Sequence, residues 1–183
     1  MGTLKYAILG LLRRNNLTGY EISKKCEASL FEFWHARHSQ IYPELKALYE
    51  AGLIDYHVAI TGNVLEKKVY SITARGIDEF TAWAEADIKN ITVPKDEFRL
   101  QLYFSDCIEP HKRLELLKNK LLLHRERYLY LQEKLQEFGN PQQLSKVQFC
   151  DYMVMQNGLL REQYQCSWLR QCIKLCKGRW DNQ

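Results

Sequence analysis

The stretch His38-Ser39-Gln40-Ile41-Tyr42-Pro43-Glu44-Leu45-Lys46-Ala47-Leu48 decides the fold, because it joins an apolar helical period to a polar first turn. The helical repeat of apolar residues places Ile41, Leu45 and Leu48 on one face of a helix. No Asp or Glu occurs between Phe33 and Pro43, where several side chains are hydrogen-bond donors. A proline fits near a helix start and not in a helix interior, so we expect the donors at an N-terminus. Backbone N–H groups there also favour phosphate, which makes this turn a candidate DNA contact.

Two helices are predicted before this segment. The first runs from Leu4 to Arg14. Thr18-Gly19-Tyr20-Glu21 then has the form of a capping box, in which the Thr hydroxyl and the Glu carboxylate each satisfy an unpaired backbone N–H. The helix that follows the box carries, four residues apart, Ile22, Cys26 and Leu30. The third helix, from about Ser39 to Ala51, ends where Gly52 suits the C′ position.

The period changes from helix to strand after Gly52. Two strands, Leu53–Ile60 and Val64–Ile72, are predicted around Thr61-Gly62-Asn63, which is typical of a hairpin turn. Thr73 then caps a fourth helix, whose inward positions are Ile77, Phe80 and Trp83. Three helices, a hairpin and a further helix form a winged helix-turn-helix, which we expect to occupy residues 1–90.

The second half of the chain is predicted to be helical. Residues 91–110 form a linker with a short helix capped by Asp96, and residues 111–183 form an antiparallel helical hairpin that turns at Gly139-Asn140-Pro141. A heptad seam lies along its first helix, at Leu114, Leu117, Leu121, Tyr128, Leu131, Leu135 and Phe138, with His124 at the one gap. The second helix, from about Gln142 to Lys177, carries Val147, Val154, Leu160, Tyr164, Trp168 and Leu175. Because one hairpin has little core of its own, we expect the seam and Trp168 to dimerise with a second copy of the chain.

Composition narrows the class of protein. The 183 residues carry a net charge of +4, and 46% of them are hydrophobic, which are ordinary globular values. The sequence lacks an apolar run of about 20 residues and the features of a secretory signal, so we expect a cytoplasmic protein that does not enter a membrane. It has neither a Gly-rich phosphate loop nor a His-Glu-x-x-His motif, and we expect no enzymatic activity, no cofactor and no metal.

The six cysteines are expected to be free thiols, as in a reducing compartment. Cys172 and Cys176 lie four apart on one helix face, either as small apolar residues or as a redox pair. One alternative is therefore a thiol redox sensor that uses Cys166, Cys172 or Cys176. His124 has two interpretations as well, a residue that sets the register of the seam, which we favour, or a pH- or ligand-sensing group.

Four motifs of the first half resemble those of PadR-type transcriptional regulators. They are, in chain order, Thr18-Gly19-Tyr20-Glu21-Ile22, His38-Ser39-Gln40-Ile41-Tyr42-Pro43-Glu44-Leu45, Gly52-Leu53-Ile54 and Val69-Tyr70-Ser71-Ile72-Thr73-Ala74-Arg75-Gly76. One departure is Cys26-Glu27-Ala28, which affects packing. The second half is similar in architecture to the larger, Vir-like branch of the family. The resemblance implies a homodimeric winged-helix protein that binds double-stranded DNA, usually as a repressor on a palindromic operator, and is often released by a small effector.

The resemblance also implies which residues contact DNA. Ser39, Gln40 and Tyr42 would enter the major groove. Tyr20 and Tyr70 would approach the DNA backbone. Lys67 and Lys68 would form the wing contact. The donor cluster adds Lys46 and His38 to the predicted DNA contacts. For His38 two roles stay open, a phosphate contact or a structural hydrogen bond.

Four aromatic residues are candidates for an effector pocket, because planar ligands suit aromatic cavities between helices. They are Trp83, Tyr128, Tyr152 and Trp168. The alternative, which we favour, is that they fill the core and the dimer interface. A winged helix can also bind proteins, so a protein–protein interaction module is the alternative from another class.

Overall fold

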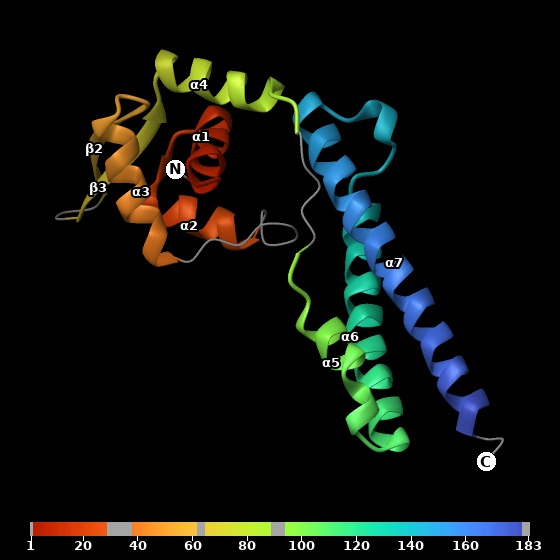
Figure 1. Ribbon diagram of the computed structural model, residues 1–183. Coiled ribbons are helices and arrows are strands. Elements are labelled where there is room, and N and C mark those ends of the chain that lie inside the picture. Colours follow the sequence, from red (N-terminus) through yellow and green to blue (C-terminus); the bar gives the residue numbers. More distant parts are fainter. Residues whose placement is uncertain (1, 29–37, 62–64, 89–93, 181–183) are drawn as a thin grey trace. The chain divides into compact units, whose positions relative to one another are not determined.

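The computed structural model describes residues 2–28, 38–61, 65–88 and 94–180, and the chain divides into two compact units, Met1–Ile91 and Thr92–Gln183 (Figure 1). Three sequence predictions lie outside the described residues. They concern the core position Leu30, the turn at Gly62 and Asn63, and the side chain of His38.

The N-terminal unit has the element order of a winged helix-turn-helix. Its elements are α1 (Leu4–Arg14), β1 (Leu17–Thr18), α2 (Gly19–Ala28), α3 (His38–Glu50), β2 (Ile54–Thr61), β3 (Leu65–Ile72) and α4 (Ala74–Glu85). The strands form an antiparallel sheet in the order β1-β3-β2, in which Tyr70 of β3 lies between Leu17 of β1 and Tyr56 of β2. The short strand β1 was not predicted, whereas the helices and the hairpin confirm the predicted fold class.

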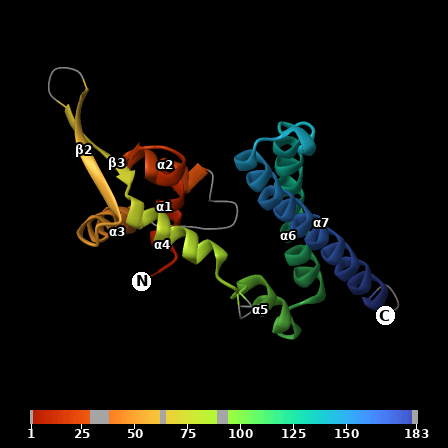
Figure 2. The same cartoon turned by 90° about the horizontal axis from the view of Figure 1, so that it is seen from above.

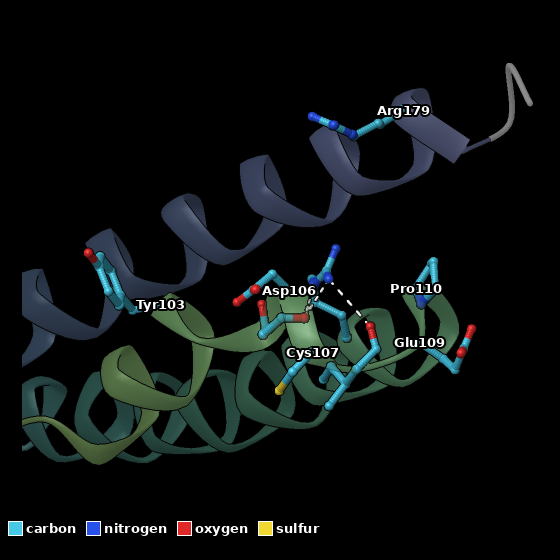
Figure 3. A pocket seen from close by; sticks show the side chains of 9 residues that line it. Tyr103, Asp106, Cys107, Glu109, Pro110 and Arg179 are labelled. Atoms are coloured by element: carbon cyan, nitrogen blue, oxygen red, sulfur yellow. Dashed lines mark hydrogen bonds between the residues drawn. The ribbon is translucent and has the colours of Figure 1, made fainter.

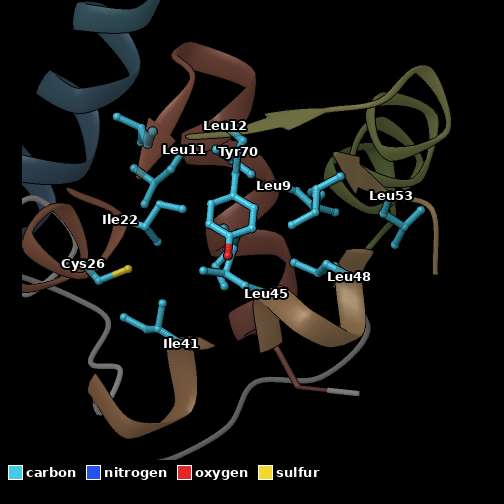
Figure 4. Packing of buried hydrophobic residues seen from close by; sticks show 13 residues of the cluster. Leu9, Leu11, Leu12, Ile22, Cys26, Ile41, Leu45, Leu48, Leu53 and Tyr70 are labelled. Atoms are coloured by element: carbon cyan, nitrogen blue, oxygen red, sulfur yellow. The ribbon is translucent and has the colours of Figure 1, made fainter. Parts of the chain in front are cut away.

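One hydrophobic core joins these helices to the sheet (Figure 4). The largest side chains that are almost completely buried in it are Ile8, Leu9, Ile22, Ile41, Leu45 and Ile54. Burying each of them stabilises the fold by roughly 1.5–3 kcal/mol. Cys26 belongs to the same cluster, and burial raises the pKa of its thiol. The departure at Cys26 is thus a small apolar core residue.

The structure confirms the caps that were predicted for helices α2, α3 and α4. Thr18 N–H donates to Glu21 Oε2 at 2.8 Å, and Glu21 N–H donates to Thr18 Oγ1 at 3.2 Å. Thr73 Oγ1 accepts a hydrogen bond from Gly76 N–H at 3.1 Å. Gly52 has a φ of 69° just after α3, as the C′ position requires.

Replacing Thr18 by alanine should destabilise the unit by about 1 kcal/mol at neutral pH, because α2 loses its cap. Two hydrogen bonds from Thr18 lower the pKa of Glu21. The larger effect comes from the Thr18 N–H, which alanine keeps, and the next comes from the Thr18 hydroxyl, which alanine removes. A carboxylate with a lowered pKa stabilises the fold above its ordinary pKa, and this contribution is lost as the pH falls through the folded-state value. Urea unfolding of both proteins should therefore show a smaller difference at about pH 3 than at about pH 7. An equal difference at both pH values would contradict the capping role of the carboxylate.

Several residues of this unit lie differently from the prediction. Pro43 lies inside α3, beyond its first turn. Its position is exposed, so water can reach the carbonyl oxygen that the missing N–H leaves without a partner. Ile77 and Trp83 were predicted to point inward but are 39% and 43% exposed. Phe80 of α4 packs on α1, so close to Gly10 that a Cβ there would be 3.0 Å from its ring.

The C-terminal unit is an antiparallel pair of long helices, which lie side by side in both views (Figures 1 and 2). Its elements are α5 (Glu97–Tyr103), the 3₁₀ turn η1 (Ser105–Cys107), α6 (Pro110–Gln136), the 3₁₀ turn η2 (Pro141–Gln143) and α7 (Lys146–Trp180). Asp96 caps α5 as predicted. The second long helix begins later than Gln142, because Ser145 and Gln148 form a capping box of their own.

The predicted heptad seam packs against α7 of the same chain. Leu117 and Leu131 of α6 are 0% exposed, as is Leu169 of α7. The Nδ1 of His124 shares a hydrogen bond with Oε2 of the buried Glu162 on α7, which supports its interpretation as a register-setting residue. The seam therefore supplies the core of one hairpin, and Leu117 and Leu131 are not accessible to a second chain.

Candidate nucleic-acid interface

The exposed side of α3 carries the predicted donors. Ser39, Gln40 and Tyr42 are all exposed, while the opposite side of the helix is in the core. Lys46 follows on the exposed side, where it forms a 3.7 Å ion pair with Glu50. Such a surface pair contributes little energy, so Lys46 can exchange Glu50 for a phosphate at small cost.

Tyr42 is held in place by the start of α2. A Cβ atom at Gly19 would lie 2.8 Å from Cε1 of Tyr42, so the ring covers the first residue of α2. Gly19 therefore allows the two helices of the helix-turn-helix to approach closely at this point. The motif Thr18-Gly19-Tyr20-Glu21 thus contributes to the site both a cap and the space for Tyr42.

Tyr20 is exposed on α2 and has a cationic neighbour that the sequence analysis missed. The Nζ atom of Lys24 lies 5.2 Å from the centroid of the Tyr20 ring. The spacing of four residues on one helix was the available signal. Together the two side chains offer a phosphate both a hydroxyl donor and a positive charge.

Tyr70 differs from the other predicted contacts because its ring belongs to the core. It is 9% exposed, and burial raises the pKa of its hydroxyl. In Figure 4 the ring runs from β3 into the cluster, with its hydroxyl directed toward α3. Tyr70 therefore packs the sheet on α3, a role that its place in the family-like motif did not indicate.

The two wing lysines lie on opposite faces of β3, because neighbouring residues of a strand alternate. Both side chains are exposed. Lys67 lies near enough to Glu21 to lower the pKa of that carboxyl. Lys68 has its Nζ atom 4.2 Å from the centroid of the Tyr56 ring. The wing thus presents two positive charges with different surroundings.

Three of the four residues predicted to line an effector pocket pack against other aromatic rings. Trp83 stacks on Tyr6 of α1, with ring centroids 4.4 Å apart and planes at 8°. In the other unit, Tyr152 meets Phe138 and Trp168 meets Phe98 edge to face. Tyr128 is half-buried on α6.

A shallow hollow lies elsewhere in the C-terminal unit, around η1 (Figure 3). Its wall is polar, and Arg113 is bound there to the carbonyl oxygens of Ser105 and Ile108. None of the four aromatic residues lines this hollow. The hollow around η1 is therefore not the aromatic pocket that was predicted for an effector.

An exposed apolar row runs along α7 on the side opposite the hairpin contact. Its large members are Phe149, Met153, Leu160, Tyr164 and Leu175. They follow steps of three and four residues, and the intervening positions of this row are also uncharged: Gln156, Ser167 and Gln171. Of the residues predicted for dimerisation, Leu114, Leu121, Tyr128, Leu135 and Trp168 are half-buried within the chain. The row on α7 thus offers a more accessible apolar surface than the seam.

Among the described residues, neither the C-terminal cysteines nor a metal-binding cluster indicates a second site. Burial raises the pKa of the Cys166 and Cys172 thiols, which lowers their reactivity as thiolates. Among the described residues, no cluster of His, Cys, Asp or Glu could hold a metal ion. Within those same ranges, no helix has the length and apolar character needed to cross a bilayer.

The helices α1 to α3, a three-stranded sheet whose hairpin carries Lys67 and Lys68, and the donors on α3 define a winged helix-turn-helix protein. Residues 8–82 match the model of the transcriptional regulator PadR-like family, and residues 94–177 match that of the virulence activator alpha C-terminal family. The negative transcriptional regulator PadR of Bacillus subtilis is 39% identical over 181 residues, which cover 96% of this chain and 98% of that protein. The chain therefore belongs to the PadR-like family of transcriptional regulators.

Two solved structures extend the similarity to the fold. The crystal structure of Bacillus subtilis PadR in complex with operator DNA has a TM-score of 0.89 and 36% identity, and covers 96% of this chain and 99% of that one. The crystal structure of the same regulator in complex with p-coumaric acid has a TM-score of 0.84 and 34% identity over the same shares. Both the winged helix and the long helical hairpin thus have counterparts in one regulator.

Proposed function

We propose that the chain is a cytoplasmic, homodimeric repressor that binds a palindromic operator through α3. The observation that carries the proposal is the exposed group of Ser39, Gln40 and Tyr42 at the start of α3. Their hydroxyl and amide groups can bond phosphates or base edges. A relative with 39% identity is a negative regulator, and its structure with operator DNA supports the same use of this fold.

The dimer supplies the spacing that an operator requires. A two-fold axis would present two copies of α3 to half-sites about 34 Å apart, one turn of the duplex. The exposed apolar side chains along α7 support pairing in the C-terminal unit, because large exposed apolar patches often mark protein–protein contacts.

Replacing Gln40 by alanine should cost roughly 1–3 kcal/mol on the operator and relax the preference at one base pair, because an amide can read an adenine edge with two hydrogen bonds. Fluorescence anisotropy with the operator and with single-base variants measures both effects. Gln163→Ala, an exposed position on α7, is the matched control. Equal losses on operator and random DNA would remove Gln40 from base recognition.

We further propose that a small aromatic acid releases the protein from DNA. The support is the p-coumaric acid complex of the Bacillus subtilis relative. An effector can shift the equilibrium between a DNA-binding and a non-binding conformation only if it binds the two with different affinities. Typical coupling energies between two ligands are 1–3 kcal/mol. Titrating p-coumaric acid into the protein–operator complex should weaken DNA binding about tenfold, whereas acetate at the same concentration should have no effect. DNA affinity that is unchanged by p-coumaric acid would exclude this effector.

A further inference from the structure

A row of tyrosine rings connects the end of α3 to the wing. Tyr49 of α3 and Tyr56 of β2 have ring centroids 4.9 Å apart, with planes at 50°. Tyr56 and Tyr70 of β3 follow at 5.7 Å and 57°. Aromatic rings at these separations and tilts attract one another beyond the area that they bury. The row therefore links the helix that carries the donors to both strands of the hairpin.

Apart from this row and the pairing of β1 with Val69 and Tyr70, the described part of the hairpin has few other supports. The core ends near Ile54 and Tyr70, and farther along the strands Val58, Lys67 and Lys68 are exposed. A two-stranded hairpin is only marginally stable without further packing. The direction of the wing relative to α3 therefore depends on contacts close to the row.

Lys68 makes such a contact. Its Nζ atom lies 4.2 Å from the centroid of the Tyr56 ring, within the range of cation–π attraction. The interaction with Tyr56 is the largest cause that raises the pKa of the Lys68 ammonium, and Tyr70 and Tyr49 act in the same direction. Lys68 shares its face of β3 with Tyr70, two residues along, and Lys67 lies on the other face.

We infer that the two wing lysines have different roles: Lys67 contacts a DNA phosphate, and Lys68 is a positioning residue. The ammonium of Lys68 bound over Tyr56 holds the wing to the tyrosine row, and the row sets the wing against α3. This inference rests on the proposed function, because it assigns to the two lysines different roles in DNA binding. It also gives Tyr56 a part in DNA binding without a DNA contact.

Operator binding measured by fluorescence anisotropy across a salt series separates the two roles. A lost phosphate contact lowers the slope of log affinity against log salt by about one unit, so Lys67→Gln should show this change. Lys68→Gln should weaken operator binding about fivefold, the order expected for an exposed cation–π contact, and leave the slope unchanged. Lys68→Arg should restore affinity, because a guanidinium also binds over an aromatic ring.

A double-mutant cycle completes the experiment. Because Tyr56 also connects the other two tyrosine rings, Tyr56→Leu should weaken binding at least as much as Lys68→Gln. If Lys68 acts through Tyr56, the double variant should lose no more than Tyr56→Leu alone. A slope lowered by about one unit in Lys68→Gln, or losses that multiply in the double variant, would overturn the positioning role. If Tyr56→Leu does not fold, the comparison of Lys67→Gln with Lys68→Gln decides alone. Wild-type protein without salt-sensitive, sequence-selective binding would overturn the proposed function as well, so the two failures are distinguishable.

Discussion

Replacing Gly76 by alanine should destabilise the N-terminal unit by about 3 kcal/mol, at the upper end of what overpacking usually costs. A Cβ atom at this position would lie 2.0 Å from the carbonyl oxygen of Leu53, a contact that only a backbone shift can relieve. The same carbonyl accepts from Thr73 N–H at 3.1 Å, and the Thr73 hydroxyl donates to the carbonyl of Gly52 at 2.8 Å. The shift would therefore disturb the junction between α3, the sheet and α4 together.

Urea unfolding followed by circular dichroism measures the effect of Gly76→Ala. Gly178→Ala is the matched control, because a Cβ there meets no atom within 4 Å. In the exposed helix this control should be neutral or should stabilise by up to about 1 kcal/mol. Equal stability of Gly76→Ala and the wild type would show that the described approach of Gly76 to Leu53 is wrong.

Replacing Leu160 by glutamate should separate the dimer and reduce operator affinity by a factor on the order of 10²–10⁴, because the second half-site is then bound independently of the first. Leu160 is 56% exposed on the apolar row of α7, so the hairpin itself should tolerate the charge. In the dimer the charge would be buried without a partner, which is strongly unfavourable. Light scattering gives the mass, and anisotropy with the operator gives the affinity.

Two controls make the Leu160→Glu result specific. Gln136→Glu adds the same charge at the exposed end of α6 and should leave both the mass and the affinity unchanged. Circular dichroism should show that Leu160→Glu keeps its helices. A Leu160→Glu protein that remains dimeric would exclude the row on α7 as the dimer surface, and a monomer with full operator affinity would exclude the role of the dimer.

Local patterns predicted much of the N-terminal unit. The box at Thr18 and Glu21, the cap at Thr73 and the left-handed Gly52 each depend on residues within a few positions of one another, so the sequence contains the whole interaction. Pro43 was less predictable, because the cost of a proline depends on whether the carbonyl that loses its partner reaches water. That exposure is a property of the folded unit.

The heptad seam shows a different limit of sequence analysis. The period of Leu117 and Leu131 requires an apolar partner helix, but it does not state which chain supplies that helix. In the structure α7 of the same chain covers them, and Gly158 lies opposite Leu131. The exposed row on α7 has the same kind of spacing, and only the exposed fractions distinguish the two.

The residues predicted to contact DNA also divide into those that the sequence could place and those that it could not. The exposed positions of Ser39, Gln40 and Tyr42 follow from the period of α3, which places Ile41 and Leu45 in the core. The different surroundings of Lys67 and Lys68 could not be predicted, because Tyr56 reaches Lys68 across the strand pair. Tyr70 is buried for a similar reason, since it lies on the central strand of the sheet.

The central claim is that the first turn of α3 lets a dimer select one DNA sequence. The most direct test is the binding of wild-type protein to the DNA upstream of its own gene and to a scrambled duplex of equal length, at two salt concentrations. The account predicts one dimer per palindrome, an affinity at least about 10³-fold above that for scrambled DNA, and a decrease with salt. Equal affinity for the two duplexes would contradict it.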